Sequence, residues 1–307
     1  MTSPTEHYDV PEWREILDRL ARMREDGDFP TGNVEFVKEQ LQSPDDRVRA
    51  AAALTAEACL FEPQVLDLVL ELAEFDDVPA IRKAAVQSLG HVIHEGVQQD
   101  FEDGEGPSTA MDDVEEWEEF QSNSLQEDYQ RVKSVLFNFL EYDEDPEIQA
   151  LALAGLADLG YQEAVREKVG EFLTNASEPS RLAALKVVGK YPQFWEGELL
   201  KLLDAETPVP VLLEAVSACF SSDSDSIAAR LVDLLNHDDP EVLQFTILTL
   251  ANLNRTHDLE AILQNFSLHP DKRVQEAARE GINQVGTRNF ELYMRDDLGM
   301  EGFDEDI

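Results

Sequence analysis

The sequence predicts an all-α fold, a right-handed solenoid of about seven helix-turn-helix repeats. One short pattern returns seven times with a period near 32 residues. Within each copy, apolar and small residues recur at i, i+3, i+4 and i+8, which places them on one face of a helix. A fixed period of this length is typical of stacked repeats, because equivalent residues must reach equivalent positions in neighbouring units.

Every copy of the pattern has the same chemical order. An acidic or Pro-containing turn leads into a core position, followed by Arg or Gln in five of the seven copies, then a variable residue and two small or apolar residues. Steps of 33, 67, 32, 32, 30 and 32 residues separate the first positions: Val48, Ile81, Ile148, Ser180, Leu212, Val242 and Val274. The step of 67 equals one repeat plus about 35 inserted residues.

A second helix completes each repeat. Proline in the turn suits the first turn of a helix, where its missing N–H costs nothing. Further amphipathic segments separate the pattern helices, for example residues 65–72, 165–173 and 227–235. Helical hairpins of this kind stack into a superhelix with a concave side.

The strings DDVPAIRKAAVQSLG from Asp76 and DEDPEIQALALAGLADLG from Asp143 resemble HEAT repeats, particularly the short form of the phycobilisome-lyase type. The resemblance covers residues 31–285. It implies a polar ladder in which the turn Asp and the helix Arg bond between neighbouring repeats. Arg49, Arg82 and Arg181 match that Arg. Four positions depart from it, so we expect apolar packing to replace the ladder in the C-terminal half: Gln149, Leu213, Leu243 and Gln275.

Outside the period, the sequence predicts three further segments. Residues 1–30 hold a capping helix, residues 96–123 an acidic insertion, and residues 286–307 an acidic tail. Repeats then occupy 31–95 and 124–285. The insertion carries the helix-breaking GEGPS and is expected to be flexible. Trp117 and Phe120 lie in its acidic part and favour the alternative of a docking segment.

Charge limits the possible partners. Asp and Glu number 65 against 24 Lys and Arg, a formal net charge of −41. Acid enrichment along the whole chain favours adaptation to a saline cytoplasm, where salt screens repulsion. The alternative is an acidic protein of an ordinary cytosol that meets basic partners. Nucleic-acid binding is disfavoured, because phosphate contact needs clusters of Lys and Arg.

The first residues do not resemble a signal peptide, and no apolar run approaches the ~20 residues that span a bilayer. These features predict a cytoplasmic protein without membrane contact.

The strongest candidate for chemistry is His91-x-x-His94-Glu95, whose imidazoles share a helix face. Zinc needs three or four ligands, so no metal site is predicted, and neither catalytic residues nor a cofactor are expected. The acidic pairs Asp76-Asp77 and Asp238-Asp239 directly precede pattern helices, where carboxylates cap backbone N–H groups.

The resulting functional prediction is a non-enzymatic scaffold or adaptor that binds a protein through its concave face. The third pattern position should point away from the packed face. That row reads Ala50, Lys83, Ala150, Leu182, Glu214, Gln244 and Glu276. The candidate contacts are Leu182, Glu214, Gln244 and Glu276, with Trp117 and Phe120 of the insertion. The acids favour a partner with a basic surface. The alternative is a factor like the phycobilin lyases, which assists maturation of another protein or attaches its cofactor.

Overall fold

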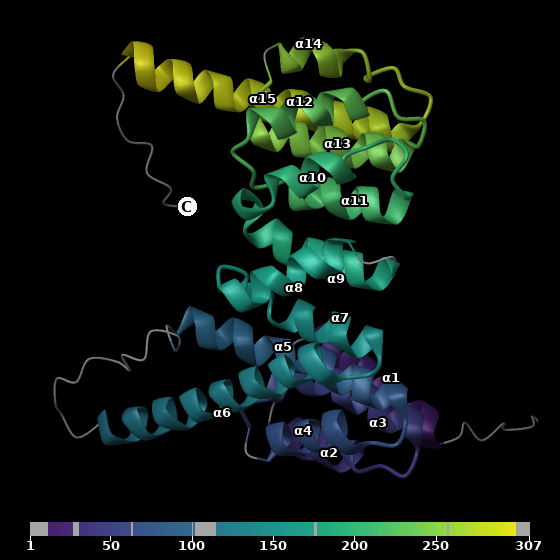
Figure 1. Ribbon diagram of the computed structural model, residues 1–307, viewed down its shortest axis with the longest axis vertical. Coiled ribbons are helices and arrows are strands. Elements are labelled where there is room, and N and C mark those ends of the chain that lie inside the picture. The colour runs from purple at the N-terminus through teal and green to yellow at the C-terminus, as the bar shows by residue number, and fades with distance from the viewer. Residues whose placement is uncertain are drawn as a thin grey trace, which may run out of the picture. The chain divides into compact units, whose positions relative to one another are not determined.

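The computed structural model describes residues 12–26, 31–62, 64–99, 101, 115–174, 177–256 and 258–298 (Figure 1). Within these ranges, the description omits the side chains of residues 12, 26, 31, 115–124 and 289–298. The described residues form helices and turns without a strand, which confirms the predicted all-α repeat fold. Contacts divide the chain into two compact units, Met1–Lys168 and Val169–Ile307.

The pattern helices carry the buried spine of each unit. All seven first positions lie on these helices with at most 1% of their surface exposed. The pattern helices are α3 (Asp46–Thr55), α5 (Pro79–Gln98), α7 (Pro146–Gly155), α9 (Glu178–Lys190), α11 (Val209–Ala218), α13 (Pro240–Leu253) and α15 (Lys272–Leu298). In the first unit α5 packs between α3 and α7, and in the second unit α9, α11, α13 and α15 pack in succession.

The remaining helices precede the pattern helices or separate them. They are α1 (Glu12–Asp26), α2 (Thr31–Leu41), α4 (Val65–Phe75), α6 (Glu115–Tyr142), α8 (Glu163–Thr174), α10 (Glu196–Leu202), α12 (Asp225–Leu234) and α14 (Leu259–Gln264). Short 3-10 turns follow three pattern helices: η1 (Ala56–Cys59), η2 (Ala157–Leu159) and η3 (Pro192–Phe194).

Aspartates start the pattern helices. The Asp45, Asp145 and Asp239 carboxylates each accept the backbone N–H two residues further on. Asp76 accepts the N–H of Val78 in the same way, at 2.9 Å. Proline occupies the first turn of α5, α7, α9, α11 and α13. The predicted capping role is therefore confirmed for Asp239, whereas Asp76 binds the N–H of Val78, the N-cap residue of α5, and no side chain caps that helix.

The second pattern position makes one recurring hydrogen bond, to the carbonyl six residues before it. Arg49 donates to Ser43 O, Arg82 to Asp76 O, Gln149 to Asp143 O and Gln275 to His269 O. All four bonds lie within a single turn, whereas the predicted ladder joins neighbouring repeats, as the bond from Arg49 to Asp76 does. At Gln149 and Gln275 the replacement of that ladder by apolar packing stays a prediction, and Leu243 is buried with 4% exposed.

Helix α1 packs against α3. Leu20 and Met23 are buried, and the Arg47 guanidinium lies 3.8 Å from the centre of the Trp13 ring. A cation placed over an indole face is attracted by its π electrons, so this contact joins α1 to the start of the first pattern helix.

Helices extend into the predicted insertion and into the predicted tail. Helix α5 continues to Gln98, α6 begins at Glu115, and α15 runs to Leu298. Phe101 is buried against the Tyr129 ring, with 6.0 Å between ring centres. Residues 102–114 and 299–307 lie outside the described residues. The predicted flexibility of the insertion and of the end of the tail therefore stays a prediction.

Candidate protein-binding surface

Four of the predicted contact residues lie on successive, mutually packed helices of the second unit. Leu182 is on α9, Glu214 on α11, Gln244 on α13 and Glu276 on α15. The first three are half-buried and Glu276 is exposed. The structure therefore brings these residues onto neighbouring helices with part of each surface open to solvent. Trp117 and Phe120 lie on α6, and their side chains are outside the described residues.

In the first unit the same row is not a free surface. Ala150 is buried with 5% exposed, so the prediction that it points outward is wrong: α7 packs against both α5 and α6. The Lys83 ammonium lies 2.9 Å from the Asp145 carboxylate and also pairs with Glu147. Lys83 thus joins α5 to α7 and is not an unpaired basic group for a partner.

A wide hollow opens on the accessible side of the second unit. Its volume is about 920 Å³, and Phe220, Leu248, Glu280, Asn283, Thr287 and Arg288 are among its lining residues. Phe220 follows α11 and is 51% exposed. Leu248 lies four residues after Gln244, and Glu280 four after Glu276. Since residues four apart share a helix face, the hollow lies one turn beyond the predicted row.

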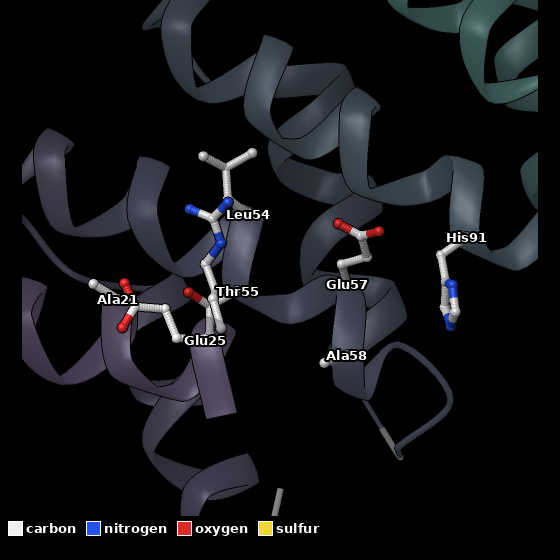
Figure 2. Close-up of a pocket in the computed structure, with 8 residues that line it drawn as sticks. Ala21, Glu25, Leu54, Thr55, Glu57, Ala58 and His91 are labelled. Atoms are coloured by element: carbon white, nitrogen blue, oxygen red, sulfur yellow. The ribbon is translucent and has the colours of Figure 1, made fainter. Parts of the chain in front are cut away.

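The first unit has a smaller hollow, of about 540 Å³, that Figure 2 shows in close-up. Ala21 and Glu25 of α1 lie on one side of it, Leu54 and Thr55 of α3 beside them, and His91 of α5 at the far side (Figure 2). Leu54 occupies the same pattern position in α3 as Leu248 does in α13, six residues after the first position. Both hollows therefore use the same stretch of a pattern helix.

The two histidines of the predicted pair have separate partners. The His91 ring lies 6.0 Å from that of Phe61, and its Nε2 is 3.9 Å from the Glu95 carboxylate. His94 Nδ1 lies 3.2 Å from the Asp158 carboxylate, which belongs to the next repeat. In the part of the chain that the structure describes, no three His, Cys, Asp or Glu side chains are grouped as metal ligands.

Two other histidines have a structural role that sequence reasoning missed. His237 Nδ1 accepts the N–H of Asp239 at 3.0 Å, and His269 Nδ1 accepts that of Asp271 at 3.1 Å. Asp76 and Asp143 make the same bond from the equivalent place in their turns. Alignment of the turns would have identified the histidines as acceptors, because all four residues lie two positions before a helix cap.

Sequence reasoning also missed Phe220, Leu248 and Leu54 as surface residues. For Leu54 and Leu248 the signal was present, since each lies four residues beyond an outward position and shares its direction. The row itself was read from a single position per repeat, and Phe220 does not lie four residues beyond such a position.

Comparison with known proteins supports the repeat assignment. The profile of the HEAT repeats family matches residues 34–104. The X-ray structure of YibA from Escherichia coli resembles this chain with a TM-score of 0.51 and 15% sequence identity, over 98% of this chain and 96% of that one. A designed armadillo repeat protein aligns with 81% of this chain and 98% of its own at 17% identity, but its TM-score of 0.33 is too low to support an argument. None of the curated proteins matches the chain.

Among the described residues, no helix combines the length and the apolar character needed to cross a membrane.

Proposed function

We propose that this chain, whose residues 34–104 match the HEAT repeats family, works as a non-enzymatic scaffold whose pattern helices bind another protein. One observation carries the proposal. In the second unit the solvent-open side of successive pattern helices presents both Leu182, Glu214, Gln244 and Glu276 and a broad hollow. Apolar side chains surrounded by polar ones at a concave surface are typical of protein-binding sites.

The acidity of the surface favours a partner with basic groups. The net charge of −41 draws cationic surfaces toward the protein and speeds encounter, an effect that salt weakens. The alternative function, a phycobilin-lyase-like factor, has no specific observation in its favour.

Site-specific photo-crosslinking tests this proposal. A photoreactive phenylalanine analogue placed at Leu182 or Gln244 should crosslink to a protein partner in a lysate of the source organism at its native salt. The matched control places the same group at Glu260, an exposed position on α14. Crosslinks of equal yield from Glu260, or protein-free crosslinking at Leu182 and Gln244, would contradict the proposed surface.

A further inference from the structure

The hollow of the second unit has an aromatic anchor with a fixed backbone. Asn252 donates its side-chain N–H to the carbonyl of Phe220 at 2.7 Å. Arg288 in turn donates to the carbonyl of Asn252. These bonds connect the ends of α11 and α13 to α15 across 32 and 36 residues. The Phe220 backbone is therefore held while the residue stays exposed to solvent.

An exposed aromatic ring on a fixed backbone suits binding. Large aromatic side chains dominate the free energy of many interfaces, and little entropy is lost when the anchor is already in position. Leu248 lies beside Phe220 in the same hollow and adds apolar surface from α13. Together the two side chains offer a place for one large apolar side chain of a partner.

Unpaired negative charge lies at the edge of this apolar surface. Glu276 and Glu280 are exposed, one turn apart on α15, and neither has an ion-pair partner among the described residues. The nearby Arg288 is already bonded to Asn252, so the cation that the hollow contains is engaged within the protein. Charge complementarity therefore favours a cationic segment along α15.

We infer that this hollow receives a basic amphipathic segment of a partner protein. An apolar side chain of the segment enters between Phe220 and Leu248, and Lys or Arg one to two turns away pair with Glu276 and Glu280. This inference rests on the proposed scaffold function and specifies the chemistry of the partner.

Fluorescence polarisation with synthetic peptides tests the inference. The probe is a dye-labelled amphipathic peptide of Leu and Lys, and the comparison peptides replace Lys by Glu or Leu by Ser. We expect the Leu/Lys peptide to bind the full chain at least about tenfold more tightly than either, a difference of about 1.4 kcal/mol. Equal binding of the Ser/Lys peptide would overturn the inference, because it would show attraction by charge alone.

Matched variants separate the hollow from the general acidity of the chain. The double variant Glu276→Lys with Glu280→Lys should weaken binding of the Leu/Lys peptide about tenfold or more. The control double variant, Glu206→Lys with Glu260→Lys, changes the net charge equally at exposed sites and should weaken binding less than about threefold. Phe220→Ser should weaken binding about tenfold, and Leu268→Ser, at a site 91% exposed, should leave it unchanged. Equal losses in both members of either pair would overturn the inference.

Circular dichroism confirms that each variant keeps its helices, and Glu276 and Glu280 are exposed enough for their substitutions to be tolerated. Failure here is distinguishable from failure of the proposed function. Protein crosslinks from Leu182 without selective binding of the Leu/Lys peptide would support the scaffold function and reject the basic segment. Absence of both the crosslinks and the selective binding would reject the scaffold function and the basic segment together.

Discussion

Arg49 and Asp76 join two successive repeats through an ion pair that is largely shielded from solvent. The Arg49 Nε lies 3.0 Å from the Asp76 carboxylate across 27 residues of sequence. The side chain of Asp76 is 7% exposed and that of Arg49 17%. The same carboxylate accepts the N–H of Val78 at the start of α5. One aspartate therefore fixes the turn that leads into a pattern helix and also holds the preceding pattern helix.

Removal of this carboxylate should destabilise the first unit. We expect Asp76→Ala to lower the free energy of unfolding by about 2 to 3 kcal/mol, because the charged guanidinium of Arg49 loses its most buried carboxylate partner. Urea unfolding followed by circular dichroism measures the change. Asp77→Ala is the matched control, since Asp77 is exposed and should change the free energy by less than about 0.5 kcal/mol. Equal effects of both variants would show that the ion pair contributes nothing.

Acid should remove the contribution of Asp76. Burial opposes ionisation of this carboxyl group, but hydrogen bonds from Arg49 and from the Val78 N–H outweigh it and lower its pKa. A lowered folded-state pKa adds stability that is complete above the unfolded value of about 3.9 and is lost as pH falls through the folded value. The difference between wild type and Asp76→Ala should therefore shrink as pH falls from about 5 to about 2.

Wild type and Asp76→Ala share all other charges. The general acidity of the chain therefore affects the free energy of unfolding of both alike and cancels in the difference between them. Urea midpoints at several pH values give the difference. A gap between wild type and Asp76→Ala that stays constant down to the lowest pH would show that ionisation of the carboxylate is not its source.

Asp45 provides an independent check at a single residue. The side-chain hydrogen bond from Arg47 lowers the pKa of Asp45 to about 2. A carboxyl titration by NMR should find Asp45 ionised well below the ordinary value of about 3.9. Arg47→Gln should return that pKa toward the ordinary range, and an unchanged pKa in this variant would contradict the assigned cause.

Periodicity was sufficient to predict the helical core. Val48, Ile81 and their five equivalents are all buried, because a period near 32 places them at the same depth in each stacked repeat. The polar contact of the second pattern position was harder to predict from sequence. Arg and Gln differ in charge, yet both side chains donate a hydrogen bond to the carbonyl six residues before them. The contact therefore depends on a side-chain N–H group that is long enough to reach this carbonyl, and not on the charge of the residue.

The candidate surface was predicted only in part. Leu182 and Glu276 lie where their pattern position suggests, whereas Ala150 is covered by the packing of α7 against α5 and α6. The long helix α6 begins inside the predicted insertion at Glu115 and continues into the predicted repeats to Tyr142, and the pattern of the other helices does not predict how it packs. Phe220 was missed because its exposure depends on where α11 ends, and the pattern does not mark that position.

Gly96 of α5 faces α6 at a place where there is no space for a side chain. A Cβ atom added at Gly96 would overlap the ring of Tyr129, which is fully buried. Gly96→Ala should therefore lower the free energy of unfolding by about 1 to 3 kcal/mol, because neither helix nor ring has space to yield. Gly170→Ala is the matched control in α8, where an added Cβ meets no atom within 4 Å.

Gly170→Ala should instead raise the free energy of unfolding, because alanine in an open helical position is favoured over glycine by up to about 1 kcal/mol. Thermal and urea unfolding of both variants decide the matter. Stabilisation by Gly96→Ala would contradict the close packing of α5 against Tyr129.

Both cysteines should resist thiol reagents in the folded protein. Burial raises the pKa of Cys59 to about 11 and that of Cys219 to about 12, so little thiolate exists near neutral pH. Reaction with Ellman's reagent should be slow in native buffer and immediate in guanidinium chloride, with Cys59 the faster of the two when folded. Rapid native labelling of Cys219, tested in a Cys59→Ser variant, would show that α11 opens readily.

Salt should stabilise the fold if the acidity is an adaptation to a saline cytoplasm. The formal charge of −41 repels itself over a screening length of about 10 Å at 0.1 M salt but only about 3 Å at 1 M. The melting temperature should therefore rise by several degrees in KCl, with most of the gain below about 1 M, where that length changes most. Sucrose is the control, since it strengthens apolar burial without screening charge. A melting temperature that falls with KCl, or that rises no more than in sucrose, would leave the acidity to be explained by basic partners instead.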